Sequence, residues 1–334
     1  LNPLYPGEQV TSEPTEPAIA ARRLARTFAQ TAAVAGVDLT IPPGEIYAFL
    51  GPNGAGKTTT VRMLTTLLRP TSGTARVCGF DVAQEPARVR VKIGVALQDA
   101  SLDLGQTGRE LLELQARLFS LRSDFARRRI DDLIALVDIG DALDRRVKTY
   151  SGGMRRRLDL ALALVHEPTV LFLDEPTTGL DPVSRREVWN EVRRLNEDNG
   201  LTVFLTTQYL DEADELAHRV GIIADGRIVA EGTPDELKRK IGRDVIVLRV
   251  EGDPDMAHAA VVSLPDVERV DVGGHEIRLM VIDGPTAIPK IAARLALAEG
   301  VKVTEMTLRR PTLDDVFLEV AGREMTQSRL GAAA

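Results

Sequence analysis

The chain has 334 residues, of which 44% are hydrophobic and 27% are charged, and its formal net charge is −7. This length predicts a main domain of about 200 residues and a smaller second domain. The negative charge argues against a protein that coats nucleic acid with a basic face, so we expect no nucleic-acid partner. Cys78 is the only cysteine, which excludes an intrachain disulfide and favours a cytoplasmic location.

The first 17 residues, LNPLYPGEQVTSEPTEP, contain four prolines and three glutamates. This composition predicts a disordered leader over 1–17. The segment lacks the pattern of a signal peptide, and no stretch reaches the roughly 18 apolar residues of a membrane helix. At the other end, the small residues over 323–334 predict a flexible tail.

Three short apolar runs stand out, EIYAFL at 45–50, TVLFLD at 169–174 and TVFLTT at 202–207. Runs without polar alternation are typical of parallel strands buried on both faces, with helices as crossovers. The pattern predicts an α/β fold with a parallel sheet. Ligands of such sheets bind beyond the carboxyl ends of the strands, so the polar residues after each run are candidate functional residues.

The region 102–165 carries amphipathic helical patterns without a strand, which predicts a helical insertion within a domain spanning 18–242. The range 243–322 shows the order strand, helix, strand, strand, helix, strand and then a final helix. This order predicts an accessory α+β domain of the ferredoxin-like type. It lacks paired carboxylates or His/Cys ligands with recognisable site spacing, so we expect an interaction or regulatory role for it.

The segment GPNGAGKTT follows the first apolar run and opens a helical pattern. It matches G-x-x-x-x-G-K-[ST], in which backbone amides and a helix N-terminus surround a polyphosphate. In this pattern the lysine contacts the β- and γ-phosphates and the following hydroxyl binds Mg²⁺. We expect the whole loop to bind nucleotide, namely Gly51, Pro52, Asn53, Gly54, Ala55, Gly56, Lys57, Thr58 and Thr59.

Two adjacent carboxylates, Asp174 and Glu175, end the second apolar run. A buried charge without a partner is costly, and a metal ion supplies such a partner. We expect Asp174 to hold Mg²⁺ together with Thr58, and Glu175 to act on the attacking water as a general base. A carboxylate that caps the following helix is the alternative interpretation of Asp174.

The segment YSGGMRRRLDLALAL places Ser151, Gly152 and Gly153 at the start of a helix, which is a second candidate anion site. On these motifs, residues 18–235 resemble the ATP-binding cassette (ABC) family. The resemblance implies a P-loop nucleoside-triphosphatase core with a helical subdomain, and ATP and Mg²⁺ as cofactors. It also implies a homodimer in which the serine and glycines of one copy face the γ-phosphate held by the other.

Three further residues match the family pattern. Gln98 in GVALQDASL resembles the glutamine that touches Mg²⁺ or water and couples the helical insertion to a membrane partner. Asp181 in TTGLDP resembles an aspartate that crosses the dimer, and Phe28 occupies the place of an aromatic that stacks on adenine. The alternatives are a polar strand end for Gln98 and a core aromatic for Phe28.

Gln208 in TTQYLDEAD stands where most family members carry a switch histidine. A glutamine amide can donate to the γ-phosphate or orient water, but it cannot become cationic near neutral pH. The resemblance thus implies a catalytic role for Gln208 beside Lys57 and Glu175, without a proton-linked step. His218 lies ten residues on in a helical pattern, and we expect it to be a surface or packing residue.

The segments at 151–157, 206–214 and 308–320 most resemble the drug-resistance branch of the family, typified by the daunorubicin/doxorubicin-resistance ATPases. This implies a Mg-dependent ATPase at the cytoplasmic face of the membrane, driving a separately encoded permease that exports drugs, antibiotics or lipids. Two alternatives remain open, a non-transport ABC ATPase of DNA repair or translation, and a nucleotide-gated binding module with weak hydrolysis. The basic triplets at 127–129 and 155–157 are expected to form solvated faces or intramolecular ion pairs.

Overall fold

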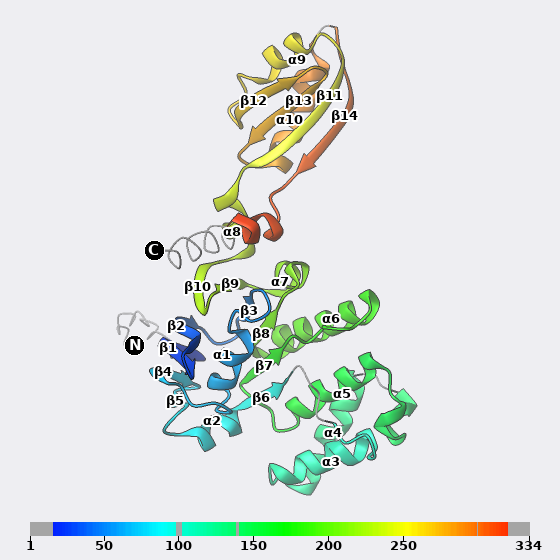
Figure 1. The fold of residues 1–334 in the computed structure, drawn as a ribbon. Helices are drawn as coiled ribbons and strands as arrows, with labels where there is room; N and C mark the ends of the chain where they lie inside the picture. The colour runs from blue at the N-terminus through cyan, green and yellow to red at the C-terminus, as the bar shows by residue number, and fades with distance from the viewer. Residues whose placement is uncertain (1–15, 98–101, 138–139, 299, 320–334) are drawn as a thin grey trace, which may run out of the picture. The chain divides into compact units, whose positions relative to one another are not determined.

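The structure, a computed structural model, describes residues 16–97, 102–137, 140–298 and 300–319. The chain divides into two compact units, Leu1–Thr233 and Pro234–Ala334 (Figure 1). Gln98, most of the leader and the predicted tail lie outside the described residues. The domain limits predicted from the sequence stay predictions. Within the described ranges, no helix has the length and apolar character needed to cross a membrane.

Six strands form the central sheet of the first unit (Figure 1). They are β3 (Ile46–Leu50), β6 (Ile93–Ala96), β7 (Val170–Asp174), β8 (Thr202–Thr207), β9 (Arg219–Ala224) and β10 (Arg227–Gly232). Their order is β10-β9-β3-β8-β7-β6, with every pair parallel except β10 and β9. The three predicted runs form the interior strands β3, β7 and β8, which confirms the α/β fold.

Aromatic side chains pack the core of this sheet. The ring centroid of Phe204 lies 5.7 Å from that of Tyr47, and 5.6 Å from those of Phe49 and Phe172. All four side chains are fully buried. Because such a core is close-packed, the strand ends are rigid supports for the polar residues that follow them. The flanking helices are α1 (Lys57–Leu64), α2 (Pro86–Lys92), α6 (Pro182–Asn199) and α7 (Leu210–Leu216).

A second, antiparallel sheet in this unit was not expected from the sequence. It consists of β1 (Ile19–Phe28), β2 (Thr31–Ile41), β4 (Ser72–Val77) and β5 (Phe80–Asp81), in the order β2-β1-β4-β5. Pairing of β1 with β2 shifts register three times, between Ala21 and Leu24, between Leu24 and Ala25, and between Arg26 and Thr27. Such bulges break the alternation of inward and outward residues, so the two-residue period that signals a strand is lost.

The predicted helical insertion between β6 and β7 is confirmed. It contains α3 (Gly108–Leu118), α4 (Ser123–Val137), two short 3₁₀ turns and α5 (Gly152–Leu164). Thr107 and Glu110 form a reciprocal capping box at the start of α3, which fixes where that helix begins. Helix α5 packs on α3, α4 and β6, so it joins the insertion to the central sheet.

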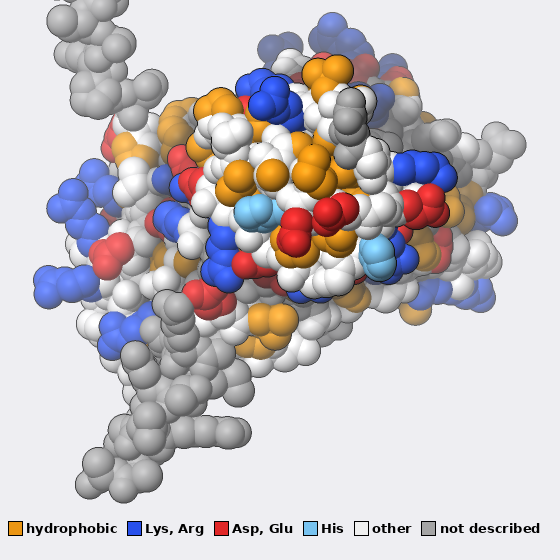
Figure 2. Space-filling view, turned by 90° about the horizontal axis from the view of Figure 1, so that it is seen from above, with side chains coloured by type: hydrophobic (Ala, Val, Ile, Leu, Met, Phe, Trp, Pro, Cys, Tyr) orange, Lys and Arg blue, Asp and Glu red, His pale blue; other side chains and the backbone are white. Residues whose placement is uncertain are grey.

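The second unit has the predicted strand and helix order, after a leading helix α8 (Pro234–Ile241). The elements are β11 (Asp244–Gly252), α9 (Pro254–Val261), β12 (Val267–Gly273), β13 (Glu276–Val281), α10 (Gly284–Ala296) and β14 (Val301–Arg309). The strand order β12-β13-β11-β14 is fully antiparallel, and α9 and α10 bury apolar side chains against it. Figure 2 shows hydrophobic side chains among acidic, basic and histidine side chains on the face seen from above.

Candidate functional site

The ends of β3, β7 and β8 meet at one edge of the central sheet. The backbone N–H of Gly51, which follows β3, donates to the carbonyl of Thr207 at 3.3 Å. The backbone N–H of Glu175, which follows β7, donates to the carbonyl of Thr206 at 3.1 Å. Since Gln208 comes directly after Thr207, the fold brings the glycine-rich loop, the paired carboxylates and the glutamine segment together.

The glycine-rich loop needs glycine at both ends. Gly56 has a φ of 108°, and a Cβ there would lie 2.5 Å from the carbonyl oxygen of Ala33. A Cβ on Gly51 would lie equally close to the carbonyl oxygen of Ile223. Both contacts are with backbone, so a larger residue would displace the loop. The loop thus stays narrow and leads directly into the first turn of α1.

Lys57 lies at the centre of the loop. Its Nζ donates to the carbonyl oxygens of Gly51 at 2.8 Å and Pro52 at 3.2 Å, and pairs with Glu175 Oε1 at 3.2 Å. The side chains of Lys57 and Glu175 are only 4% and 6% exposed. A cavity of about 300 Å³ opens beside this pair. It is lined by Ala33, Asn53, Gly54, Gly56, Lys57, Thr58, Thr59 and Glu175.

Thr206 organises the two carboxylates, and sequence reasoning missed it. Its hydroxyl donates to Asp174 Oδ1 at 2.6 Å and accepts from the backbone N–H of Glu175 at 3.0 Å. Glu175 itself has a φ of 49°, a left-handed conformation that is strained for a residue with a side chain. Thr178 donates to Glu175 Oε2 at 3.2 Å. These bonds hold Glu175 toward the lysine rather than along the strand.

The oxygen donors beside the loop suit a magnesium ion. Thr58 Oγ1 lies 3.2 Å from Asp174 Oδ1, and both side chains border the loop that holds Lys57. Mg²⁺ prefers hard oxygen ligands and binds few protein groups when nucleotide phosphates complete its shell. The hydroxyl and carboxylate predicted from the sequence therefore fit this ion.

The Ser-Gly-Gly turn lies apart from the lysine loop of the same chain. Ser151 caps α5 by accepting from the backbone N–H of Met154 at 3.2 Å, and both Ser151 and Gly152 are exposed. Gly153 is buried, and a Cβ there would lie 3.1 Å from the hydroxyl of Ser184. None of the three lines the cavity beside Lys57.

Asp181 borders this turn. Its Oδ1 caps α6 by accepting from the backbone N–H groups of Val183 and Ser184, and its Oδ2 accepts from the hydroxyl of Ser184 at 2.6 Å. These hydrogen bonds, that of the hydroxyl first, lower the pKa of Asp181. Because Ser184 also lies against Gly153, the aspartate and the Ser-Gly-Gly turn share one exposed surface of the chain.

Of the remaining predicted residues, those that the structure describes do not line the cavity beside Lys57. Gln208 is partly exposed just beyond β8. Phe28 is 45% exposed at the end of β1, and the Arg26 guanidinium lies 4.7 Å from its ring centroid. Gln98 falls outside the described residues. The Nδ1 atom of His218 accepts from the backbone N–H of Ile46 at 3.1 Å, in agreement with a packing role.

One member of the basic triplet at 155–157 is buried, and it forms an intramolecular ion pair, the second of the two expected arrangements. Arg156 Nη1 donates to the carbonyl of Leu97 at 2.7 Å and to Asp159 Oδ2 at 3.1 Å, and Nη2 donates to the carbonyl of Asp174 at 3.5 Å. The guanidinium thus ties α5 to the ends of β6 and β7. An aspartate three residues later within an apolar helix was the available signal for the ion pair.

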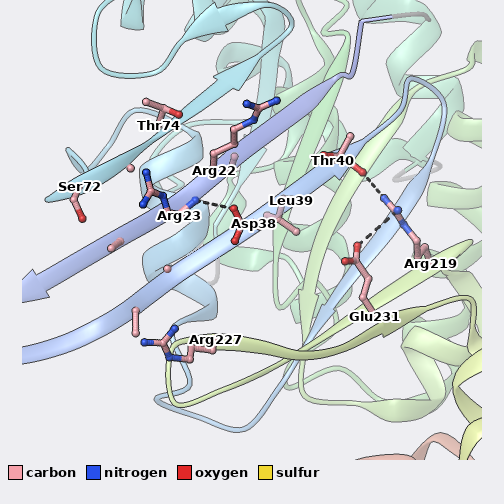
Figure 3. A pocket seen from close by; sticks show the side chains of 15 residues that line it. Arg22, Arg23, Asp38, Leu39, Thr40, Ser72, Thr74, Arg219, Arg227 and Glu231 are labelled. Carbon is pink, nitrogen blue, oxygen red and sulfur yellow. Dashed lines mark hydrogen bonds and ion pairs between the residues drawn. The ribbon is translucent and has the colours of Figure 1, made fainter.

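A larger groove lies elsewhere in the first unit, on β1, β2, β4 and the β9-β10 hairpin. Its volume is about 1340 Å³, and its lining includes Arg22, Arg23 and Arg227 (Figure 3). Asp38 accepts from the backbone N–H of Arg23 at 2.9 Å. No residue predicted to bind nucleotide lines this groove. Size alone therefore does not locate the site, and the chemistry points to the cavity beside Lys57.

A glycine loop around a buried lysine, with two carboxylates at the end of β7, defines a P-loop nucleotide-binding protein. Family models give the particular family. The model described as "ABC transporter" matches residues 34–178, and "ATP-binding protein DrrA1-3-like, C-terminal domain" matches residues 232–321. The chain belongs to the ABC transporter family, and it is an ATP-binding subunit of that family.

Curated relatives and solved structures agree. Daunorubicin resistance ATP-binding protein DrrA2 of Streptomyces coeruleorubidus is 46% identical over 320 residues, which cover 95% of this chain and 99% of the relative. Nod factor export ATP-binding protein I of Paraburkholderia xenovorans (strain LB400) is 38% identical, with 93% and 99% covered. A Clostridium perfringens subunit, described as part of an ABC transporter complex, matches 75% of this chain and 96% of its own with a TM-score of 0.62 and 25% identity.

Replacement of Asp159 by asparagine tests the buried pair on α5. Burial raises the pKa of Asp159 from 3.8 to about 6, an effect that Arg156 opposes only in part. A raised pKa stabilises the folded chain at pH values below the unfolded pKa, and this contribution is lost as the pH rises through about 6. Relative to Asp159→Asn, the wild-type chain should therefore lose on the order of 2 kcal/mol of stability between pH 4 and pH 7.

Thermal unfolding of the full-length wild-type and Asp159→Asn chains across this range measures the difference. Asp144, which is fully exposed and pairs with Arg109, provides a control as Asp144→Asn. A wild-type chain that gains stability over Asp159→Asn as the pH rises would show that attraction to Arg156 outweighs burial.

Proposed function

We propose that the chain hydrolyses ATP in a Mg²⁺-dependent reaction and, as a homodimer at the cytoplasmic face of the membrane, drives a separate permease that exports drugs, antibiotics or lipids. The carrying observation is the cluster of Lys57, Thr58, Asp174 and Glu175, joined by contacts of 3.2 Å. The proposed class of cargo is supported by the names of two relatives, one a daunorubicin resistance protein and the other a Nod factor export protein.

The reaction is attack of water on the γ-phosphorus with loss of ADP. Phosphate oxygens in the cavity replace Glu175 as partners of Lys57, and the released carboxylate accepts the proton of the attacking water. The bond from Thr178 and the strained backbone keep Glu175 aimed into the cavity during this exchange. Thr58 and Asp174 would hold Mg²⁺, which would supply positive charge to neutralise the phosphates.

The dimer completes the site. The exposed turn Ser151–Gly152 presents a hydroxyl and backbone at a helix N-terminus, which attracts an anion, yet it does not line the cavity of its own chain. A second copy placed head to tail would bring this turn to the γ-phosphate. Asp181 shares the same surface and would lie at the interface.

A groove on the helical insertion suits the permease. Its volume is about 400 Å³, and it runs between α3, α5 and the end of β6. Its lining combines polar side chains, such as Arg90 and Gln115, with apolar ones. Among the apolar ones are Leu67, which is 58% exposed, and Phe119, which stacks on His166 with ring centroids 3.7 Å apart. Gln98, which the family resemblance links to coupling with a membrane partner, follows β6 in the sequence, so we propose that a short apolar helix of the permease binds in this groove.

The two alternatives make different demands. A DNA-repair or translation ATPase would need long helical arms or a second cassette, whereas the insertion here consists of short helices. A weakly hydrolysing binding module is favoured only by Gln208. The aligned contacts of Glu175 with Lys57 and Thr178 favour a hydrolytic site instead.

Replacement of Glu175 by glutamine should slow ATP hydrolysis by about 100-fold or more, because the amide cannot accept the proton of water. Nucleotide binding should persist, since the loop and Lys57 are untouched. Phosphate release and nucleotide affinity of the full-length protein measure the two effects. Glu113→Gln, on the exposed face of α3, serves as the control. Turnover close to that of the wild type would remove Glu175 from the role of base.

Replacement of Gln208 by histidine should introduce a step in the pH profile of turnover near histidine's usual pKa of about 6.5, with higher turnover on the side where the imidazole is cationic. The reason is that a cation beside the γ-phosphate stabilises the developing charge. A pH series of phosphate release for both chains gives the answer. Identical profiles would place position 208 out of contact with the reacting phosphate.

We expect the adjoining reading frame to encode a membrane protein, and the transport role is tested with that protein. Co-expressed with that protein, the full-length chain should sediment with membranes and hydrolyse ATP faster than alone, in a manner abolished by EDTA. A charged residue in the groove, as in Phe119→Asp, should abolish both effects but leave turnover of the isolated chain measurable. Recovery only in the soluble fraction, with unchanged turnover, would contradict a permease partner.

A further inference from the structure

A buried glutamate lies behind the nucleotide site, outside the cluster described above. Glu212 on α7 has no exposed surface. Its Oε1 accepts from the hydroxyl of Thr177 and from the indole Nε1 of Trp189, each at 2.9 Å. Thr177 is also fully buried, and Trp189 is 9% exposed. Desolvation raises the pKa of Glu212, and the hydrogen bonds only partly offset it.

Glu212 and its two hydrogen-bond partners lie on segments with different proposed roles. Thr177 lies in the turn between Glu175 and Asp181, so it joins the proposed base to the proposed interface. Trp189 lies on α6, the helix that Asp181 caps. Helix α7 begins two residues after Gln208, and Glu212 lies four residues after Gln208. One carboxyl oxygen therefore connects the glutamine segment, the turn after β7 and the helix beyond it.

A purely structural explanation is weaker. An apolar residue would fill the same space without the cost of burying a carboxyl group, which is substantial unless hydrogen bonds compensate. Here two side chains on separate segments donate to one carboxyl oxygen, Oε1, so the bonds also fix the distance between those segments. Bonds of this kind define one arrangement of the parts more sharply than apolar packing does.

We propose that Glu212 is a positioning residue that holds Gln208 in register with the Glu175–Asp181 turn, so that the switch glutamine, the base and the dimer surface move together when nucleotide binds. The inference rests on the proposed function, because it needs a nucleotide at Lys57. Glu212 lies behind the reacting groups and acts through Thr177 and Trp189.

The chain carries its own reporter. Trp189 is the only tryptophan in the sequence, so tryptophan emission from the full-length protein comes from this ring alone. Because its indole N–H donates to Glu212, addition of MgATP should change the emission maximum and acrylamide quenching of the wild-type protein. These readouts are independent of turnover.

Three substitutions of Glu212 separate the effect of side-chain length from the effect of its charge. Glu212→Gln keeps the length of the side chain and an acceptor oxygen, Glu212→Asp keeps the charge but is one methylene shorter, and Glu212→Ala removes both. We expect Gln to retain the MgATP-induced emission change and turnover within about 3-fold. Asp and Ala should lose the emission change and lower kcat by about 10- to 100-fold, the range for misplaced catalytic groups, with KM for ATP changed far less.

Two controls make the result specific. Glu215→Ala alters an exposed glutamate on the same helix, paired with Arg193 at 2.8 Å, and should leave the MgATP response of Trp189 in place. Thr177→Val removes the other donor to Glu212 and should reproduce the loss of kcat while the tryptophan bond remains. Thermal melting of each chain identifies any variant that fails to fold. If the Glu212 variants fail to fold, kcat of the Thr177→Val chain tests the role of Glu212.

The outcomes are distinguishable from failure of the proposed function. A wild-type chain that hydrolyses ATP, with Trp189 emission indifferent to MgATP and turnover unaffected by Glu212→Ala or Thr177→Val, would overturn the role of Glu212 and leave the ATPase intact. Rescue by Asp but not by Gln would also overturn it, because charge rather than reach would then be required. Absence of both binding and hydrolysis in the wild type would overturn the proposed function itself.

Discussion

The parallel pairing of β7 with β8 is the constraint on which the site depends, because it sets Asp174 opposite Thr206. The threonine hydroxyl can then donate to Asp174 and accept from the next backbone N–H, that of Glu175. A shift of one residue along either strand would turn these side chains to the opposite face. The positions of the proposed metal ligand and the proposed base thus follow from strand register, and the aromatic core keeps that register rigid.

The same edge of the sheet holds only half of the proposed reaction site. Lys57 and its loop face the cavity, whereas the Ser-Gly-Gly turn and Asp181 lie together on another exposed surface. The N-termini of α1 and α5 both favour anions, but they lie on different surfaces of one chain. In a head-to-tail pair, the α1 N-terminus of one copy would face the α5 N-terminus of the other. The helical insertion places the start of α5 away from the lysine loop of the same chain, and this placement is the reason for the proposed homodimer.

Buried polar groups connect these surfaces to the core. Arg156 ties α5 to the carbonyl ends of β6 and β7, and Glu212 ties α7 to the turn after β7 and to α6. Neither group is placed to touch a phosphate. Because each binds two or more segments, a displacement of one segment costs hydrogen bonds in the others. Such links would carry the effect of nucleotide binding to the proposed dimer and permease surfaces.

The sequence by itself determined the features that depend on neighbouring residues. The loop at 51–59, the strand before it and α1 are local, since glycine placement and apolar runs define them without distant partners. The antiparallel sheet escaped prediction because bulges in β1 erase its alternation. Only the tertiary structure decided the distant partners of Thr206, Arg156 and Glu212, which lie 18 to 59 residues away along the chain. Contacts over such separations depend on how strands are ordered in a sheet, and no local pattern encodes that order.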